Sequence, residues 1–138
     1  MALQILVAAV VSSAMAHMPK VETFELFWKG QPQRNPYELL RNCCGSTSLD
    51  FGVGTPSGLV LRPGQMFSFL YFNRTQQNGP ILDTLRAGMN NIFIRYCYCS
   101  AFDECWVGTD QFGKSRDMHP PRVPMCPQPE VPYNNQRS

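Results

Sequence analysis

Cysteines are the residues of this chain most able to do chemistry, and three of the six lie close together. Cys97 and Cys99 are two positions apart in NIFIRYCYCSAFDECW, residues 91–106, and Cys105 follows after a short turn. The first half of this segment alternates as a strand does, so Cys97 and Cys99 are expected on one face. An even number of cysteines in 138 residues predicts a disulfide framework in an oxidising compartment. The segment is therefore interpreted as the covalent centre of a small β-domain.

The remaining cysteines, Cys43, Cys44 and Cys126, leave the pairing open, because six cysteines allow about 15 connectivities. Adjacent cysteines rarely bond to each other, so Cys43 and Cys44 are each expected to reach a distant partner. A bridge from either to the Cys97/Cys99 strand would close a loop of about 55 residues. Cys126 is expected to join the C-terminal segment to its own domain, with a bridge to a second subunit as the alternative. The spacings lack the C-x-x-C pairs of common zinc sites, so disulfides are favoured over zinc.

Two histidines, His17 and His119, form a candidate metal site because each lies next to a methionine. Thioether and imidazole groups are ligands that copper favours. If a leader is cleaved after Ala16, His17 would offer its α-amine and its ring, and His119 could add a third nitrogen. An N-terminal histidine on a secreted β-sandwich is similar to the histidine brace of lytic polysaccharide monooxygenases. This resemblance implies copper as the alternative to the main expectation, which is that the protein has no cofactor.

Catalysis by a hydrolytic nucleophile finds little support in the sequence. There is no G-x-S-x-G motif, and a Ser or Cys nucleophile would need His17 or His119 as its base. Asp103 and Glu104 are adjacent, and neighbours on an extended chain face opposite ways, so a solvated turn is favoured over an acid/base pair. Whether the protein is an enzyme is left open, and a non-enzymatic function is favoured.

Other binding sites are suggested by single residues. Trp28 and Trp106 could form an aromatic platform for carbohydrate, although burial is the favoured interpretation. Asn73 begins the sequon Asn-Arg-Thr, which is a glycosylation site only in a eukaryotic secretory pathway. The net charge is +2 and no basic cluster is present, so nucleic-acid binding is not expected.

The elements that must position these residues are predicted from hydrophobic periodicity and turn residues. A helix is expected from Asn35, where the chain reads N-P-x-E, and a second helix is expected to end at Gly88 in the left-handed conformation. The run at residues 66–72 is apolar on both faces and predicts a central strand covered on both sides. About six to eight strands are expected in all. The elements assigned to residues are strands at 20–28, 49–53, 66–72, 91–99 and 106–109 and helices at 35–42 and 80–88.

The two ends of the chain differ in composition from its middle. Residues 1–16 are uncharged and end in Ala-Met-Ala, which indicates a cleaved signal peptide, with an N-terminal membrane helix over residues 1–18 as the alternative. Residues 17–112 are expected to form the β-domain. Residues 113–138 hold six prolines between Pro120 and Pro132 and are interpreted as an extended proline-rich arm outside the core.

Together these patterns predict a mainly β fold. We expect a small disulfide-stabilised β-sandwich or jelly-roll-like domain with two short helices and a proline-rich C-terminal arm. Charged residues make up only 16% of the chain, which suits a surface covered by another protein. The expected function is an extracytoplasmic interaction module, or a small subunit of a larger assembly, either soluble or membrane-bound, whose partner protein contacts the 113–138 arm. The alternatives are a copper-binding protein or copper-dependent oxidase, and a carbohydrate-binding module.

Overall fold

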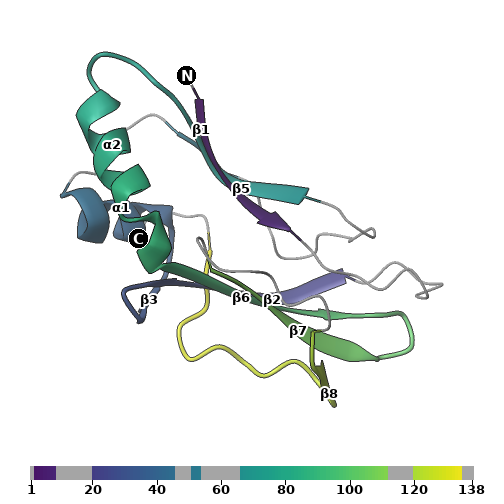
Figure 1. Cartoon of the computed structure of the whole chain (residues 1–138). Coiled ribbons are helices and arrows are strands. Elements are labelled where there is room, and N and C mark those ends of the chain that lie inside the picture. Colours follow the sequence, from purple (N-terminus) through teal and green to yellow (C-terminus); the bar gives the residue numbers. More distant parts are fainter. Residues whose placement is uncertain (1, 9–19, 46–50, 54–65, 112–119, 135–138) are drawn as a thin grey trace.

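The protein is a mainly β domain in which two antiparallel sheets and two short helices share one core (Figure 1). The computed structural model describes residues 2–8, 20–45, 51–53, 66–111 and 120–134, with side chains described for 20–45, 51, 70–111 and 120–134. The smaller sheet has the order β1-β5-β4 and the larger has the order β3-β2-β6-β7-β8. In chain order the elements are β1 (Ala2–Ala8), β2 (Lys20–Trp28), β3 (Gln31–Gln33), α1 (Pro36–Cys44), β4 (Gly52–Val53), β5 (Met66–Asn73), α2 (Gly79–Ala87), the 3-10 helix η1 (Met89–Asn91), β6 (Ile92–Cys99), β7 (Cys105–Gln111) and β8 (Arg122–Val123).

The strands that the alternation predicted are present. β2 spans Lys20–Trp28 and pairs antiparallel with β6, with Leu26 opposite Ile94 and Phe27 opposite Phe93. Leu26 and Ile94 are buried, whereas the flanking residues are partly exposed, as a half-buried pleated strand requires. Of the strand expected at residues 49–53, Gly52–Val53 form β4 and Phe51 lies outside it, while residues 49–50 lie outside the described part of the chain. A mainly β antiparallel fold with two helices and disulfides is confirmed. The finer expectation of a sandwich or jelly roll is not confirmed, and neither sheet of the described residues is closed.

Helix α1 begins as its sequence indicates. The Asn35 side chain accepts a hydrogen bond from the Glu38 backbone N–H at 2.8 Å, and Pro36 occupies the first helical turn. Gly45 ends the helix with φ of +70°, a conformation that costs glycine little, and its N–H donates to the Arg41 carbonyl. Local capping therefore determines both ends of this helix.

Gly88 follows the last residue of helix α2, as predicted, but it does not take the conformation expected of it. Gly88 has φ of −100°, so the left-handed conformation expected there is wrong. A Cβ at this position would lie 2.7 Å from Cη2 of Trp28, a distance that real Cβ atoms do not reach. Gly88 is needed because Trp28 packs against its backbone. The indole is accordingly buried between β2 and the end of α2.

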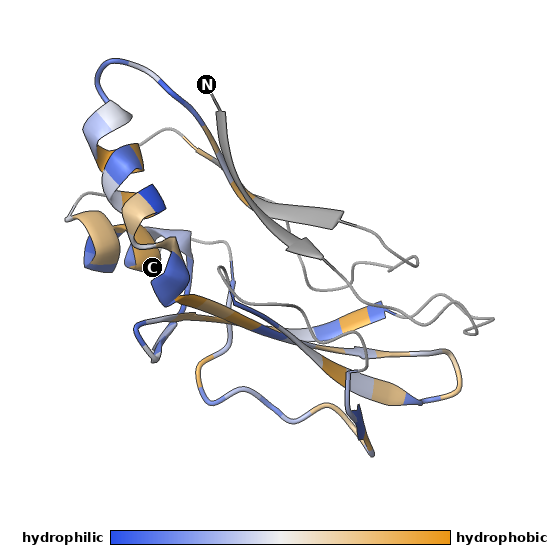
Figure 2. Cartoon of the chain, in the orientation of Figure 1, coloured by the Kyte–Doolittle hydropathy of each residue, from blue (hydrophilic) through white to orange (hydrophobic). Residues whose placement is uncertain are grey.

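The core lies where the helices meet the start of β6 and the end of β2, and Figure 2 shows hydrophobic stretches of α1, α2 and β6 converging there. β5 contributes Leu70 and Phe72, both buried. Tyr71, between them, is 45% exposed, so the expectation that β5 is covered on both sides is wrong at this end of the strand. The buried apolar residues are Val21, Phe24, Leu26, Trp28, Leu39, Leu40, Leu70, Phe72, Leu82, Leu85, Ile92, Ile94, Tyr96, Tyr98 and Tyr133.

The N-terminal segment is extended where it is described. Ala2–Ala8 form β1, which pairs antiparallel with β5, so the helix required by the membrane-anchor alternative is not seen in these residues. Within the described part of the chain, no helix has the length and apolar character needed to span a bilayer. Cleavage after Ala16 stays a prediction, and it would remove β1 from the edge of β5.

Candidate functional site

The outer face of the larger sheet, opposite the core, carries a charged pair flanked by aromatic rings. Glu25 on β2 lies directly across from Arg95 on β6. Nε and Nη2 of Arg95 donate to the two Glu25 carboxylate oxygens at 2.8 and 2.9 Å, and these hydrogen bonds raise the pKa of Arg95. The guanidinium also lies 5.3 Å from the centre of the Phe27 ring, whose other neighbour is Phe93 at 5.7 Å. Arg95 is therefore held in one position by three contacts.

A groove of about 640 Å³ lies between this face and the C-terminal arm. Its floor is the sheet, including the Glu25–Arg95 pair and Cys97, and its far wall is the arm at residues 127–131. Two prolines in that wall, Pro127 and Pro129, lack the N–H group that a sheet would bond. The groove therefore combines a wall in which Pro127, Pro129 and Val131 alternate with Gln128 and Glu130 and a floor that carries one ion pair.

Four sulfur atoms meet at one end of this groove. Cys97 is bonded to Cys126 of the arm, and Cys99 is bonded to Cys105 across the β6–β7 hairpin. The Sγ atoms of Cys97, Cys99 and Cys126 all lie within 4.8 Å of one another. This proximity follows from the strand alternation, which places Cys97 and Cys99 on one face. Disulfide sulfurs are not the thiolates that metals bind, so in this form the cluster is a cross-link.

The hairpin between β6 and β7 is closed by hydrogen bonds as well as by the Cys99–Cys105 disulfide. The Ser100 N–H donates to the Glu104 carbonyl at 2.8 Å, and Ser100 Oγ accepts from the Phe102 N–H at 3.2 Å. Asp103 takes a positive φ of 58° and donates its N–H to the Ser100 carbonyl. The turn, residues 100–104, is therefore held in one conformation at its base and along its length.

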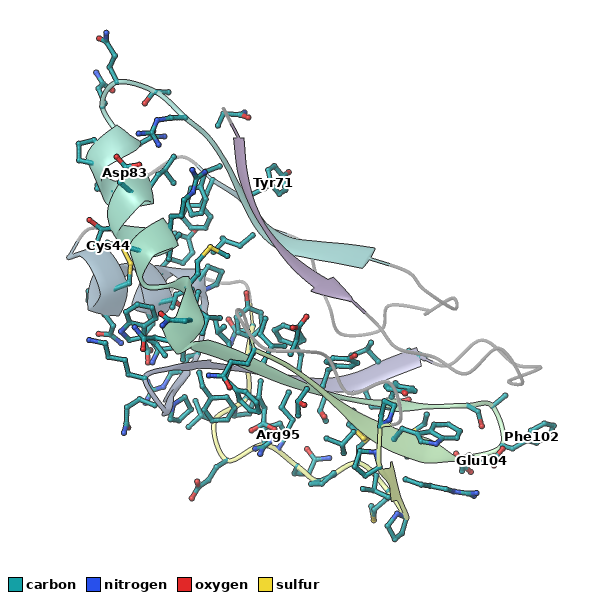
Figure 3. All side chains as sticks on the ribbon, in the orientation of Figure 1. Cys44, Tyr71, Asp83, Arg95, Phe102 and Glu104 are labelled. Atoms are coloured by element: carbon teal, nitrogen blue, oxygen red, sulfur yellow. A yellow bond between two sulfur atoms is a disulfide. The ribbon has the colours of Figure 1, made fainter. Side chains whose placement is uncertain are left out.

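This turn exposes a large apolar side chain. Phe102 is 66% exposed, and Figure 3 shows it pointing away from the end of the hairpin. Met125, next to Cys126 in the arm, is 72% exposed. Arg122 and Glu104 form an ion pair of 3.4 Å that links the arm to the turn. We call Phe102 and this ion pair the tip surface.

The arm is part of the domain along the residues described. β8 pairs with β7, Cys126 bonds to Cys97, and the Asn134 N–H donates to the Arg34 carbonyl at 2.8 Å. Tyr133 is buried, with its ring 5.1 Å from that of Phe24. The expected bond from Cys126 to its own domain is present. The expectation that the arm lies outside the core is wrong at Tyr133, because this aromatic side chain completes the core beside β2.

The pairing of Cys43 and Cys44 also differs from expectation. They are bonded to each other at the end of α1, where both pack against the core. The other four cysteines satisfy one another at the sulfur cluster, so no distant partner remains for this pair. The predicted bridge to the Cys97/Cys99 strand is therefore absent.

Of the residues proposed for metal and carbohydrate binding, the structure describes Trp28 and Trp106 but neither histidine. His17 and His119 lie outside the described residues. Trp28 is buried in the core and cannot offer an open ring face. Trp106 is half-buried and stacks on Tyr98 with ring centres 5.7 Å apart. Asp103 is exposed in the hairpin turn, and its neighbour Glu104 pairs with Arg122.

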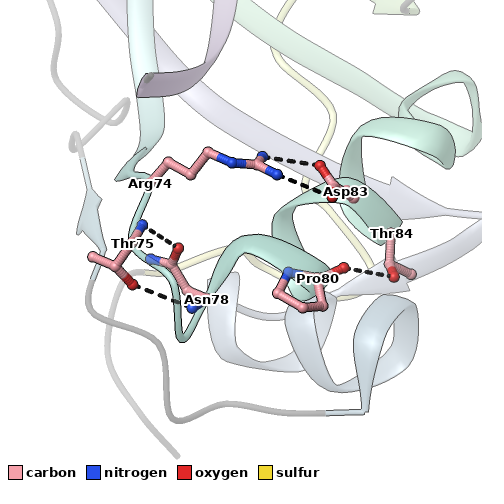
Figure 4. A network of polar contacts seen from close by, with 6 residues as sticks. All are labelled: Arg74, Thr75, Asn78, Pro80, Asp83 and Thr84. Carbon is pink, nitrogen blue, oxygen red and sulfur yellow. Dashed lines mark hydrogen bonds and ion pairs between the residues drawn. The ribbon is translucent and has the colours of Figure 1, made fainter.

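Asn73 is exposed at the end of β5, beside a turn fixed by polar contacts (Figure 4). The sequon residue Thr75 exchanges two hydrogen bonds with Asn78, at 2.7 and 3.2 Å. Arg74 donates two hydrogen bonds to the Asp83 carboxylate, and these bonds lower the pKa of Asp83. The acceptor side chain is thus on the surface, and its glycosylation stays a prediction.

Three features of this region were not anticipated from the sequence: the exposure of Phe102, the Glu25–Arg95 pair and the burial of Tyr133. One sequence signal for the first was present, since Phe102 is an aromatic residue in a turn bounded by two cysteines. Comparison with protein family models, curated proteins and solved structures finds no match to this chain.

Proposed function

We propose that this protein is an extracytoplasmic, disulfide-stabilised interaction module, a small non-enzymatic subunit that docks onto another protein through its tip surface. The observation that carries the proposal is Phe102, a large apolar side chain 66% exposed on a turn that a disulfide closes. Exposed apolar side chains in a rigid setting are typical binding hot spots, because ordering them costs little entropy on association.

The partner that fits this surface has an apolar pocket for one aromatic ring with a polar rim. Met125 can add apolar contact, since methionine adapts its shape to the surface it meets. The Arg122–Glu104 pair, whose Glu104 belongs to the same turn as Phe102, supplies both charges for the rim. Within the 113–138 arm, we therefore assign the contact with the partner to residues 120–126, the first part of the arm that the structure describes.

The location outside the cytoplasm is supported by the three disulfides. Disulfides persist in oxidising compartments and are rare in the cytosol. Intact mass of the protein from its native source tests this part of the proposal. We expect a non-reduced mass for residues 17–138 with all six cysteines oxidised. A mass with free thiols would contradict the location. A mass that retains residues 1–16 with all six cysteines oxidised would contradict the cleavage and favour the membrane-anchored alternative, which also lies outside the cytoplasm.

A photo-crosslinking experiment tests the docking surface. Benzoylphenylalanine is placed at position 102, and at position 71 as the matched control, because Tyr71 is also exposed but belongs to the smaller sheet. Illumination in the native cell should give one adduct of defined mass from position 102 and none from position 71. Equal adducts from both positions, or none from position 102, would exclude the tip surface.

The substitution Phe102→Ala then measures the contribution of the ring. A hot-spot residue contributes about 2 kcal/mol or more, so affinity for the crosslinked partner should fall about 30-fold. Tyr71→Ala should leave affinity unchanged. Thermal unfolding of both variants checks that the domain stays folded, and a change of less than about twofold for Phe102→Ala would refute the proposal.

A further inference from the structure

The two disulfides at the end of the groove are close enough to react with each other. Sγ of Cys99 lies 3.5 Å from Sγ of Cys126, although these atoms belong to different disulfides. A thiolate exchanges disulfides by attacking a sulfur atom directly, so contact between the two sulfurs is the first requirement. The sequence Cys97-Tyr98-Cys99 produces this contact, because it places two sulfurs on one strand face, opposite a single cysteine of the arm.

The solvent exposure of the four cysteines determines which of them an external thiol can attack first. Cys97 and Cys105 are buried, with 2% and 4% of their surface exposed. Cys99 and Cys126 are each partly exposed. The two reachable residues are therefore the two members of the 3.5 Å pair.

We infer that Cys97, Cys99, Cys105 and Cys126 form a thiol–disulfide exchange site that accepts two electrons from a dithiol. In the first route one thiolate of the dithiol attacks Cys99, and Cys105 leaves as a thiolate. The second thiol of the dithiol then attacks the dithiol sulfur that is bonded to Cys99. The dithiol becomes a disulfide, and Cys99 is released as a thiolate. Cys99 attacks Cys126, which breaks the Cys97–Cys126 bond and forms Cys99–Cys126.

The second route begins at Cys126 and reaches the same product. The dithiol opens Cys97–Cys126, is itself oxidised, and leaves thiolates on both residues. The Cys126 thiolate attacks Cys99 across the 3.5 Å contact and expels Cys105. Both routes give a Cys99–Cys126 disulfide and thiols at Cys97 and Cys105, each of which takes up one proton.

This product has properties that two independent disulfides would not give. The arm stays bonded to β6 after two-electron reduction, because Cys99 replaces Cys97 as its anchor. The bond that closes the hairpin turn is lost. A thiol appears at Cys97, which lines the groove next to the arm. The inference is independent of the docking proposal, since it depends only on the four sulfurs.

Partial reduction of the native protein tests the exchange. The full chain is treated with limiting dithiothreitol, quenched in acid, labelled with N-ethylmaleimide and mapped by tandem mass spectrometry. Molecules with two labels among these four cysteines should carry them on Cys97 and Cys105, with Cys99 crosslinked to Cys126. Labels on Cys99 and Cys105, or on Cys97 and Cys126, would show disulfides that react independently and would overturn the inference.

A pair of variants isolates the exchange step without added reductant. Cys105→Ser leaves Cys99 without its partner, so the single thiol of the cluster should appear on Cys97 in a fraction on the order of one half. The matched control, Cys99→Ser with Cys105→Ser, lacks the attacking sulfur and should retain Cys97–Cys126 with no label on either residue. A label confined to Cys99 in the first variant would again refute the inference.

Discussion

The two ends of the larger sheet are stabilised in different ways. At the end near the helices, the end of β2 and the start of β6 are covered by α1 and α2, and residues such as Leu40, Leu85 and Ile92 have no exposed surface. At the hairpin end, β6, β7 and the arm are joined by Cys97–Cys126 and Cys99–Cys105, and the large side chain of Phe102 is exposed. Apolar burial holds the first end together, whereas at the second end two disulfides add to the burial of Val21 and Tyr98.

The difference has a physical cause. Burying apolar surface contributes about 25 cal/mol per Å², so it stabilises only those segments that have a second layer to pack against. The hairpin turn has no such cover, and a disulfide instead lowers the entropy of the unfolded chain. A small domain can thereby present a projecting, apolar surface without losing its shape.

The largest effect is expected from removing packing at the helical end. Leu40→Ala leaves a cavity among fully buried side chains, and the free energy of unfolding should fall by about 2–5 kcal/mol. Val107→Ala is the control, because Val107 lines the open groove and should cost about 1 kcal/mol or less. Denaturant unfolding under non-reducing conditions measures both. Equal losses would mean that the two ends do not differ in packing.

Removing the bond between arm and sheet comes next. Cys97 and Cys126 are 29 positions apart, so the double substitution to serine should lower the free energy of unfolding by about 3.5 kcal/mol in the chain-entropy model. Cys43→Ser with Cys44→Ser opens a ring between adjacent residues and should cost less than about 1 kcal/mol. If the second pair of substitutions proved the more damaging, packing rather than cross-linking would be the role of these cysteines.

A pH effect is expected from Tyr133, the arm residue that enters the core. Burial raises its pKa above the ordinary value of about 10, so the neutral form is favoured in the folded state. The contribution of Tyr133 to the free energy of unfolding is complete below pH 10. It is lost as pH rises further, by up to about 1.4 kcal/mol per pH unit. Tyr133→Phe should flatten the decline of stability between pH 10 and 12, as measured by denaturant unfolding. An unchanged slope would show that Tyr133 is not buried in solution.

The smallest stability effect is expected at the tip surface. Phe102→Ala removes an exposed ring, so the free energy of unfolding should change by no more than about 0.5 kcal/mol. Thermal unfolding checks this. A loss of 2 kcal/mol would place Phe102 in the folded packing and remove the basis for calling it a docking residue.

Several elements could be predicted because their signals are local. Alternation over residues 20–28 predicted β2, and the helix-start pattern N-P-x-E predicted the hydrogen bond between Asn35 and Glu38. The shared face of Cys97 and Cys99 followed from the two-residue period of a strand. These features depend on neighbours within a few positions, so the sequence contains all the information they need.

The features that were missed depend on residues far apart in the chain. Gly88 is required by the ring of Trp28, which is 60 positions earlier, and no local pattern reports such a contact. Tyr133 lies in a proline-rich segment whose composition indicates an arm, but its ring reaches Phe24. Cys43 and Cys44 are bonded to each other, and the remaining four cysteines are bonded among themselves, a set of pairings that no local pattern reports.

By itself, the sequence determined the class of this protein: a mainly β antiparallel domain with two short helices and a disulfide framework. Alternation, caps and cysteine number act over short distances or through composition, so they can be evaluated without coordinates. The tertiary structure alone decided which sulfurs meet, which face of the sheet is open and which aromatic rings reach solvent. Those outcomes depend on how β2, β6, β7 and the arm pack together, and the candidate site consists of the surfaces that this packing leaves uncovered.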